Sequence, residues 1–127
     1  IVNNTVLKVT VPGSKKDYYP NKTKSSALKV NSGASVTFTT PGSTDLSYSL
    51  TVNYIATSAG SYKLEYEENG ETKTYSSTID LPAAGSLGST STAAEIATAD
   101  SITVPGGTTF TLKQNKTETY LTGITIE

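Results

Sequence analysis

Apolar and polar residues alternate along most of this chain, and the two-residue period predicts short β-strands. Residues 46–55 show the pattern well, because Leu50, Val52 and Tyr54 occupy every second position and successive side chains of a strand point to opposite faces. The same period predicts further strands at residues 6–11, 27–30, 35–40, 61–67, 77–81, 101–104, 108–113 and 118–126. About nine short strands imply two packed sheets.

Turn residues connect some of these strands. Asn69-Gly70 tolerates positive φ at both central positions of a two-residue loop, so residues 62–66 and 72–75 are expected to form a hairpin. Pro105-Gly106-Gly107 is a second expected turn.

Two segments lack the alternation. Residues 12–26 are expected to form a loop that holds most of the basic charge, and residues 82–100 form an irregular insertion rich in Gly, Ser, Ala and Thr. Within the insertion, residues 92–98 are expected to adopt either a short helix or an edge strand. The length of 127 residues and the lack of a fixed-period repeat predict that residues 1–127 are a single module.

The composition agrees with an all-β fold. The chain has 23 Thr, 16 Ser and eight Tyr; Thr and Tyr favour strands, while Ser, Gly and Pro favour turns. We therefore expect an all-β protein in which two antiparallel sheets pack as a jelly-roll-like β-sandwich.

The residue types that are missing exclude much chemistry. The sequence has no Arg, His, Cys, Met or Trp, so it has no Ser-His or Cys-His nucleophile, no thiolate or imidazole zinc site and no disulfide. No cofactor is expected, and the only metal site left open is an oxygen-ligand site for Ca²⁺. No apolar run approaches the ~20 residues that span a bilayer, so no membrane partner is expected.

The charges are segregated along the chain. The first 29 residues hold six lysines and one aspartate, a net charge of +5, while the rest of the chain has a net charge of −6. The six are Lys8, Lys15, Lys16, Lys22, Lys24 and Lys29. Such a stretch is either an ordinary solvated surface or a site for an anionic partner. Nucleic acid fits poorly, because its recognition favours Arg and the sequence pI is about 5.4.

Tyrosines add apolar faces to the basic stretch. Tyr18 and Tyr19 are candidates for stacking on sugar rings, and packing at the edge of the sandwich is an equally good interpretation. For Tyr62, Tyr66 and Tyr75 we expect core or cross-strand packing. The glutamates around Asn69-Gly70 are expected to be solvated, since nothing places two carboxylates across a cleft as a glycosidase needs.

Two stretches carry a resemblance to a known family. Residues 27–40 hold a Leu28-Lys29 pair followed by a Ser/Thr-rich stretch that ends in Phe38-Thr39-Thr40, and residues 105–113 form a Gly-containing stretch that ends in Lys113 ahead of the last strand. Both resemble segments of the pectin-binding carbohydrate-binding modules of family 77.

The resemblance implies a function and a set of residues. Modules of that family are β-sandwiches appended to pectin-degrading bacterial enzymes, and they bind homogalacturonan through lysines. It therefore implies Lys29 and Lys113 as binding residues, with a third basic position at Lys15 or Lys16. It also implies a secreted protein that is covalently linked to a catalytic module, and we expect a monomer.

The sequence thus leads to one hypothesis and three alternatives. The hypothesis is a non-catalytic module that binds low-ester pectin through Lys15, Lys16, Lys29 and Lys113, with Tyr18 and Tyr19 as sugar contacts. The alternatives are a neutral-glycan binder with a tyrosine platform, a structural spacer or adhesin domain, and a polysaccharide lyase that uses Lys as base.

Overall fold

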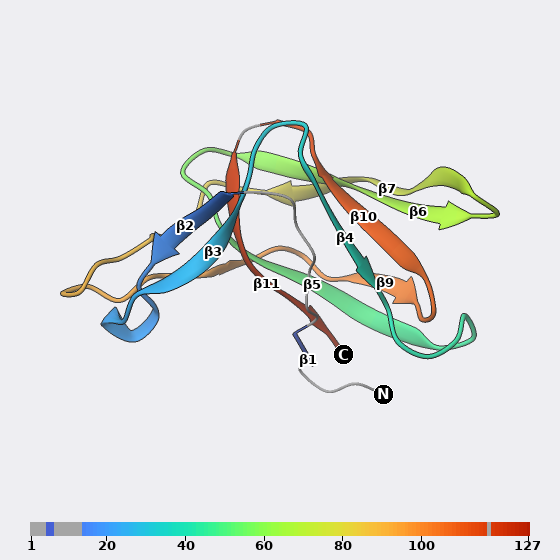
Figure 1. Ribbon diagram of the computed structural model, residues 1–127, viewed down its shortest axis with the longest axis horizontal. Coiled ribbons are helices and arrows are strands. Elements are labelled where there is room, and N and C mark those ends of the chain that lie inside the picture. Colours follow the sequence, from blue (N-terminus) through green and yellow to red (C-terminus); the bar gives the residue numbers. More distant parts are fainter. Residues whose placement is uncertain (1–4, 7–13, 117) are drawn as a thin grey trace.

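A computed structural model describes residues 5–6, 14–116 and 118–127. In this part of the chain the strands form two sheets, and the larger sheet contains seven strands. Its main path runs β2-β3-β11-β5-β8, with β1 also paired to β11 and β9 to β5 (Figure 1). The strands are β1 (Thr5–Val6), β2 (Ser14–Tyr18), β3 (Ser25–Val30), β5 (Ser47–Ile55), β8 (Ala97–Thr98), β9 (Ile102–Pro105) and β11 (Thr119–Ile126). Each of these pairings is antiparallel.

The smaller sheet has four strands in the order β4-β10-β6-β7, again antiparallel. They are β4 (Ser35–Thr39), β6 (Gly60–Glu68), β7 (Glu71–Leu81) and β10 (Thr109–Gln114). A single 3₁₀ turn, η1 (Pro20–Lys22), is the one helical element of the described residues.

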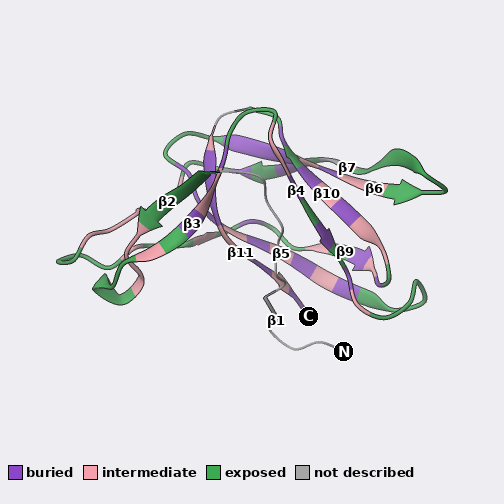
Figure 2. Cartoon of the chain, viewed as in Figure 1, coloured by how far each residue is buried: buried purple, intermediate pink, exposed green. Residues whose placement is uncertain are grey.

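The two sheets bury the alternate apolar residues of their strands between them. On β5, Leu50 and Val52 are each 1% exposed, and on β10, Phe110 and Leu112 are fully buried. Phe110 stacks on Phe38 of β4 with ring centroids 5.7 Å apart. Figure 2 shows these buried segments on β5 and β10. The expected two-sheet antiparallel sandwich is therefore confirmed.

The expected hairpin is also confirmed. Glu68 pairs with Glu71, and the two residues between them, Asn69 and Gly70, have φ of 53° and 80°. Residues 72–75 and 77–81 belong to one strand, β7, whose register against β6 shifts on both sides of Leu64. Of the expected strand at 6–11, residues 7–11 lie outside the described residues, while β1 pairs with the end of β11.

The expectation of a loop at residues 12–26 is wrong. Ser14–Tyr18 is strand β2, which pairs along its whole length with β3, and β3 begins at Ser25. Strand β2 lies at the edge of the sheet and its first four residues are exposed. Since neither face of β2 is deeply buried, its sequence needs no apolar alternation.

The insertion at residues 82–100 is largely irregular and folds over the outer face of the larger sheet. Within it, residues 97–98 form the edge strand β8, which pairs with β5. Of the two structures expected within residues 92–98, a short helix or an edge strand, the edge strand is therefore the one that forms. Two backbone hydrogen bonds join the insertion to Tyr19, whose N–H donates to the carbonyl of Leu87 and whose carbonyl accepts from Ala94, each at 2.8 Å. Leu87 also packs on the cluster of Ala27, Ile55 and Tyr120.

Buried polar side chains connect the two sheets where β10 ends and β11 begins. Thr119 Oγ1 of the larger sheet accepts from Gln114 Nε2 at 2.8 Å and hydrogen-bonds the Tyr62 hydroxyl at 2.9 Å. Gln114 and Tyr62 belong to the smaller sheet, and all three residues are at most 1% exposed. A satisfied network of this kind favours one register of β10 against β6 and one position of β11 across from them in the other sheet.

This network makes stability sensitive to alkaline pH. Burial raises the pKa of Tyr62 from 10.0 to about 12, against a smaller lowering by the Thr119 hydrogen bond. Between these two values the unfolded chain has lost its phenol proton while the folded chain retains it, so the free energy of unfolding falls as pH rises. We expect a loss of about 2 kcal/mol from this group between pH 10 and pH 12.

Urea unfolding between pH 8 and pH 12 measures this dependence. Tyr62→Phe should lose about 0.5–1.5 kcal/mol at pH 8, because one hydrogen bond is removed, and should then fall less steeply than the parent above pH 10. A parallel decline of the two proteins would show that Tyr62 is not responsible.

Candidate functional site

Two of the candidate lysines share one outward face of the larger sheet. Lys16 on β2 lies opposite Ala27, and Lys29 on β3 lies opposite Ser14 on one side and Tyr120 on the other. Residues that are directly opposite in antiparallel strands point to the same face, so Lys16 and Lys29 are diagonal neighbours with Cα atoms about 7–8 Å apart. The structure therefore selects Lys16 over Lys15 as the partner of Lys29 on this face.

The lysines stand over a small apolar base. Lys16 Nζ lies 5.9 Å from the ring centroid of Tyr120, a cation–π contact worth about 0.5–1 kcal/mol at an exposed site. Tyr120 itself is only 9% exposed and packs with Ala27 and Ile55. Its ring supports the Lys16 ammonium and is not an open stacking platform.

One carboxylate lies among the cations. Glu118 Oε1 is 3.7 Å from Lys29 Nζ, and both side chains are about one-third exposed, at 37% and 36%. Burial raises the pKa of Tyr120, helped by a hydrogen bond to Glu118 and by its negative charge. Glu118 thus lies next to both the Lys29 ammonium and the Tyr120 phenol.

Three further lysines belong to the same segment of the chain. We call the five lysines of residues 14–29 the basic surface. They are Lys15, Lys16, Lys22, Lys24 and Lys29. Against them, residues 14–29 hold one acid, Asp17, whose carboxylate lies 3.5 Å from Lys24 Nζ. The segment thus has a net charge of +4, and four of its five lysines are exposed.

The structure does not bring the remaining two lysine candidates to the face of Lys16 and Lys29. Lys15 lies opposite Leu28 and so points to the other side of the edge strand β2. Lys113 lies on β10 of the smaller sheet, opposite Ser35 and Lys63, and it points outward because its neighbours Leu112 and Gln114 are buried. The expected convergence of Lys113 with Lys29 is therefore wrong, since the two lysines lie on opposite outer faces of the sandwich.

Both candidate tyrosines are partly buried. Tyr18 is half-buried against the cluster of Ala27, Ile55 and Tyr120. Tyr19 is also half-buried, and its backbone fastens the insertion. Both residues follow Lys16 in the basic segment, and each is only partly exposed to a ligand.

Metal ligands and paired acids do not gather in the described part of the chain. Among these residues there is no group of three or more Asp, Glu, His or Cys that would hold a metal ion, and no helix is long and apolar enough to cross a membrane. Two hairpin acids form ion pairs, Glu65 with Lys63 at 3.6 Å and Glu68 with Lys73 at 3.6 Å.

Sequence reasoning missed Tyr120 and Glu118 as members of this face. The alternation over 118–126 places these two residues on one side of the last strand, which is the signal that the sequence offered. Their meeting with Lys29 depends on the pairing of β11 with β3, Tyr120 against Lys29, and no local pattern specifies that register.

The comparisons with known proteins extend to the β-sandwich fold and to no family. No protein-family model and no curated protein matches the sequence, so the likeness to family 77 modules has no family-level support. Solved structures do match at the level of the fold.

Three of these structures come from carbohydrate-active proteins. A CBM35 from Cellvibrio japonicus Abf62 matches with a TM-score of 0.56 at 20% identity, over 98% of this chain and 87% of that one. The isomalto-dextranase of Arthrobacter globiformis T6, complexed with panose, matches with a TM-score of 0.56 at 15% identity, over 90% of this chain and 21% of the enzyme. A GH115 4-O-methyl-α-glucuronidase, BtGH115A, with specificity for decorated arabinogalactans, matches with a TM-score of 0.55 at 9% identity, over 99% of this chain and 18% of the enzyme.

Proposed function

We propose that this chain is a non-catalytic module that binds an anionic plant cell-wall polysaccharide, low-ester homogalacturonan, on its basic surface. The observation that supports this most directly is the placement of Lys16 and Lys29 on one outward face, within a segment of net charge +4 in a chain of net charge −1. Ammonium groups on a fixed strand pair offer point charges to successive carboxylates along a polymer.

The strength of the contacts suits a polymer better than a small ligand. An exposed Lys-carboxylate pair contributes about 0.2–1 kcal/mol, so the few lysines of the basic surface hold a short oligosaccharide weakly. Successive uronates along one chain raise the effective concentration after the first contact, and avidity supplies the rest.

The comparisons support the module as the setting for this activity. The chain spans only 21% and 18% of two of the matched enzymes, so domains of this fold occur within much longer carbohydrate-active chains. We propose the same setting here: an accessory module of a larger, secreted enzyme.

Affinity electrophoresis tests the proposed ligand. We expect polygalacturonate to retard the protein more than xyloglucan or β-glucan does, because neutral glucans offer the lysines no carboxylate. Retardation should weaken as salt rises to about 0.5 M, since exposed pairs are screened beyond a Debye length of ~10 Å at 0.1 M. Highly methyl-esterified pectin should retard the protein little, because the ester removes the charge and leaves the sugar faces intact.

Two outcomes would contradict the proposal. Equal retardation by neutral glucans would show that carboxylates are not what is recognised. Undiminished binding of fully esterified pectin would assign recognition to the sugar faces instead of the lysines.

A further inference from the structure

The end of the sandwich away from the basic surface is hollowed. A cleft of about 660 Å³ lies between residues 66–70 and Tyr75 of the β6–β7 hairpin, the turn and start of β10 at 105–110, and Thr44. Its volume falls within the about 300–1,000 Å³ that is usual for small-molecule sites. Figure 1 shows the β6–β7 turn at the opposite end of the long axis from β2 and β3, so the cleft is separate from the basic surface.

Aromatic rings form one corner of the cleft. The ring of Tyr75 meets that of Tyr66 edge-on, with centroids 5.9 Å apart and planes at 85°, and meets Phe110 in the same way at 5.5 Å and 84°. The Tyr75 hydroxyl donates to the carbonyl of Thr103 on β9 at 2.8 Å, which fixes the ring between the two sheets. Tyr75 nevertheless remains 41% exposed, so the residue is held in place and still open to a ligand.

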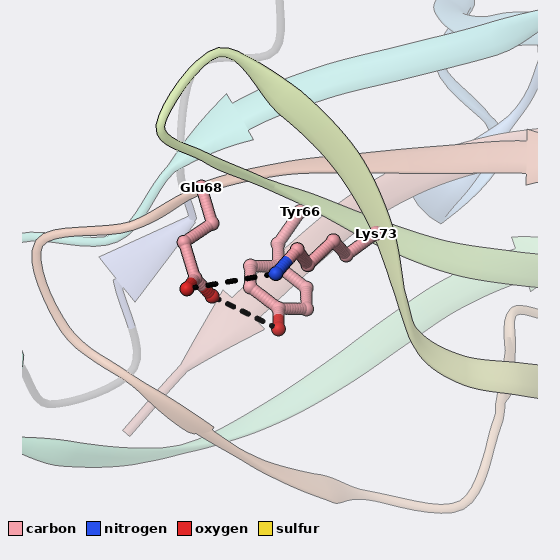
Figure 3. A network of polar contacts seen from close by, with 3 residues as sticks. All are labelled: Tyr66, Glu68 and Lys73. Carbon is pink, nitrogen blue, oxygen red and sulfur yellow. Dashed lines mark hydrogen bonds and ion pairs between the residues drawn. The ribbon is translucent and has the colours of Figure 1, made fainter.

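A neutralised pair of charges lies beside this corner. Glu68 accepts a hydrogen bond from the Tyr66 hydroxyl at 3.3 Å and lies 3.6 Å from Lys73 Nζ, as Figure 3 shows. Its side chain and that of Lys73 are 50% and 42% exposed. A carboxylate has about four acceptor positions and an ammonium has three donors, so both groups keep free hydrogen-bonding capacity.

This combination selects a chemical class of ligand. Apolar C–H faces of a pyranose pack on tyrosine rings, and its hydroxyls both donate to a carboxylate and accept from an ammonium. An anionic sugar is disfavoured, because two carboxylates, Glu67 and Glu68, line the cleft, while the ammonium beside it, that of Lys73, is already paired with Glu68. We propose that the cleft binds a neutral pyranose unit of a polysaccharide, independently of any uronate at the basic surface.

NMR titration of the ¹⁵N-labelled whole chain tests this site. The probes are cellohexaose, xylohexaose, mannohexaose and maltohexaose, each to millimolar concentration, and an oligogalacturonide. At least one neutral hexasaccharide should shift the amide signals of residues 66–75 and 105–110 and leave those of 14–29 unmoved. Glu68→Gln should weaken that binding at least about tenfold, since it removes the charged acceptor.

A matched variant isolates the role of the cleft. Glu65→Gln makes the same chemical change on the same strand, but Glu65 pairs with Lys63 and does not line the cleft, so its affinity should equal that of the parent. The inference is overturned if no neutral probe shifts the cleft signals, if the oligogalacturonide shifts them instead, or if Glu65→Gln and Glu68→Gln weaken binding alike. If Glu68→Gln folds poorly, the amide shifts of the parent protein still show whether a neutral hexasaccharide binds in the cleft.

Discussion

Replacing Lys16 and Lys29 together by glutamate is expected to abolish retardation by polygalacturonate. The double change lowers the net charge of residues 14–29 from +4 by four units, to zero. It also leaves the carboxylate of Glu118, now 3.7 Å from Lys29 Nζ, beside another acid. The loss of two attractive contacts and the gain of repulsion should lower affinity by at least about tenfold, while stability changes little because the sites are on the surface.

The chain offers a closely matched control for that experiment. Lys63 and Lys113 lie opposite each other on the outer face of the smaller sheet, and Lys63 pairs with Glu65 at 3.6 Å much as Lys29 pairs with Glu118. Replacing both by glutamate changes the total charge equally and should leave retardation near that of the parent. Equal loss in the two double variants would mean that the protein attracts polyanions only through its overall charge.

The second large effect expected is a loss of stability when a residue on the buried face of β10, but not one on its exposed face, is replaced by alanine. Leu112 is fully buried and lies between Val36 and Leu64, so Leu112→Ala should lower the free energy of unfolding by about 2–5 kcal/mol. Lys113, the next residue, points outward and is exposed, and Lys113→Ala should change stability by less than about 0.5 kcal/mol. Urea unfolding of the two variants measures the contrast.

The outcome also bears on the basic surface. If Lys113→Ala were as destabilising as Leu112→Ala, Lys113 would point into the core. Its placement on the outer face of the smaller sheet, away from Lys29, would then have to be revised. With Lys113 outward on the smaller sheet, Lys113→Ala should leave retardation by polygalacturonate unchanged.

Local patterns were sufficient to predict most of the fold. The alternation around Leu50 and Val52 exists because one side of β5 faces the other sheet, and a buried face leaves a period of two in the sequence. Asn69-Gly70 predicted its hairpin because positive φ is a property of the two residues themselves. Strand β2 was missed for the converse reason, since an edge strand without a buried face leaves no such period.

The candidate site was predicted less well, because it depends on contacts between distant strands. Alternation indicates that Lys29 and Lys113 both face solvent, but the sheet that each strand joins is set by long-range pairing. The cleft was missed for a similar reason. Tyr75 sits where the register of β7 against β6 shifts, and this shift accompanies contact of its ring with Tyr66 and Phe110.

The position of β2 gives its lysines a second physical role. In the described part of the chain β2 is the last strand on its side of the larger sheet, and such a strand presents unpaired backbone groups to which another molecule can add a strand. Consecutive cations at Lys15 and Lys16 repel a second copy of the same edge and so oppose self-association of the sheets. Under the proposed function, the lysines of β2 would therefore serve both ligand recognition and resistance to self-association.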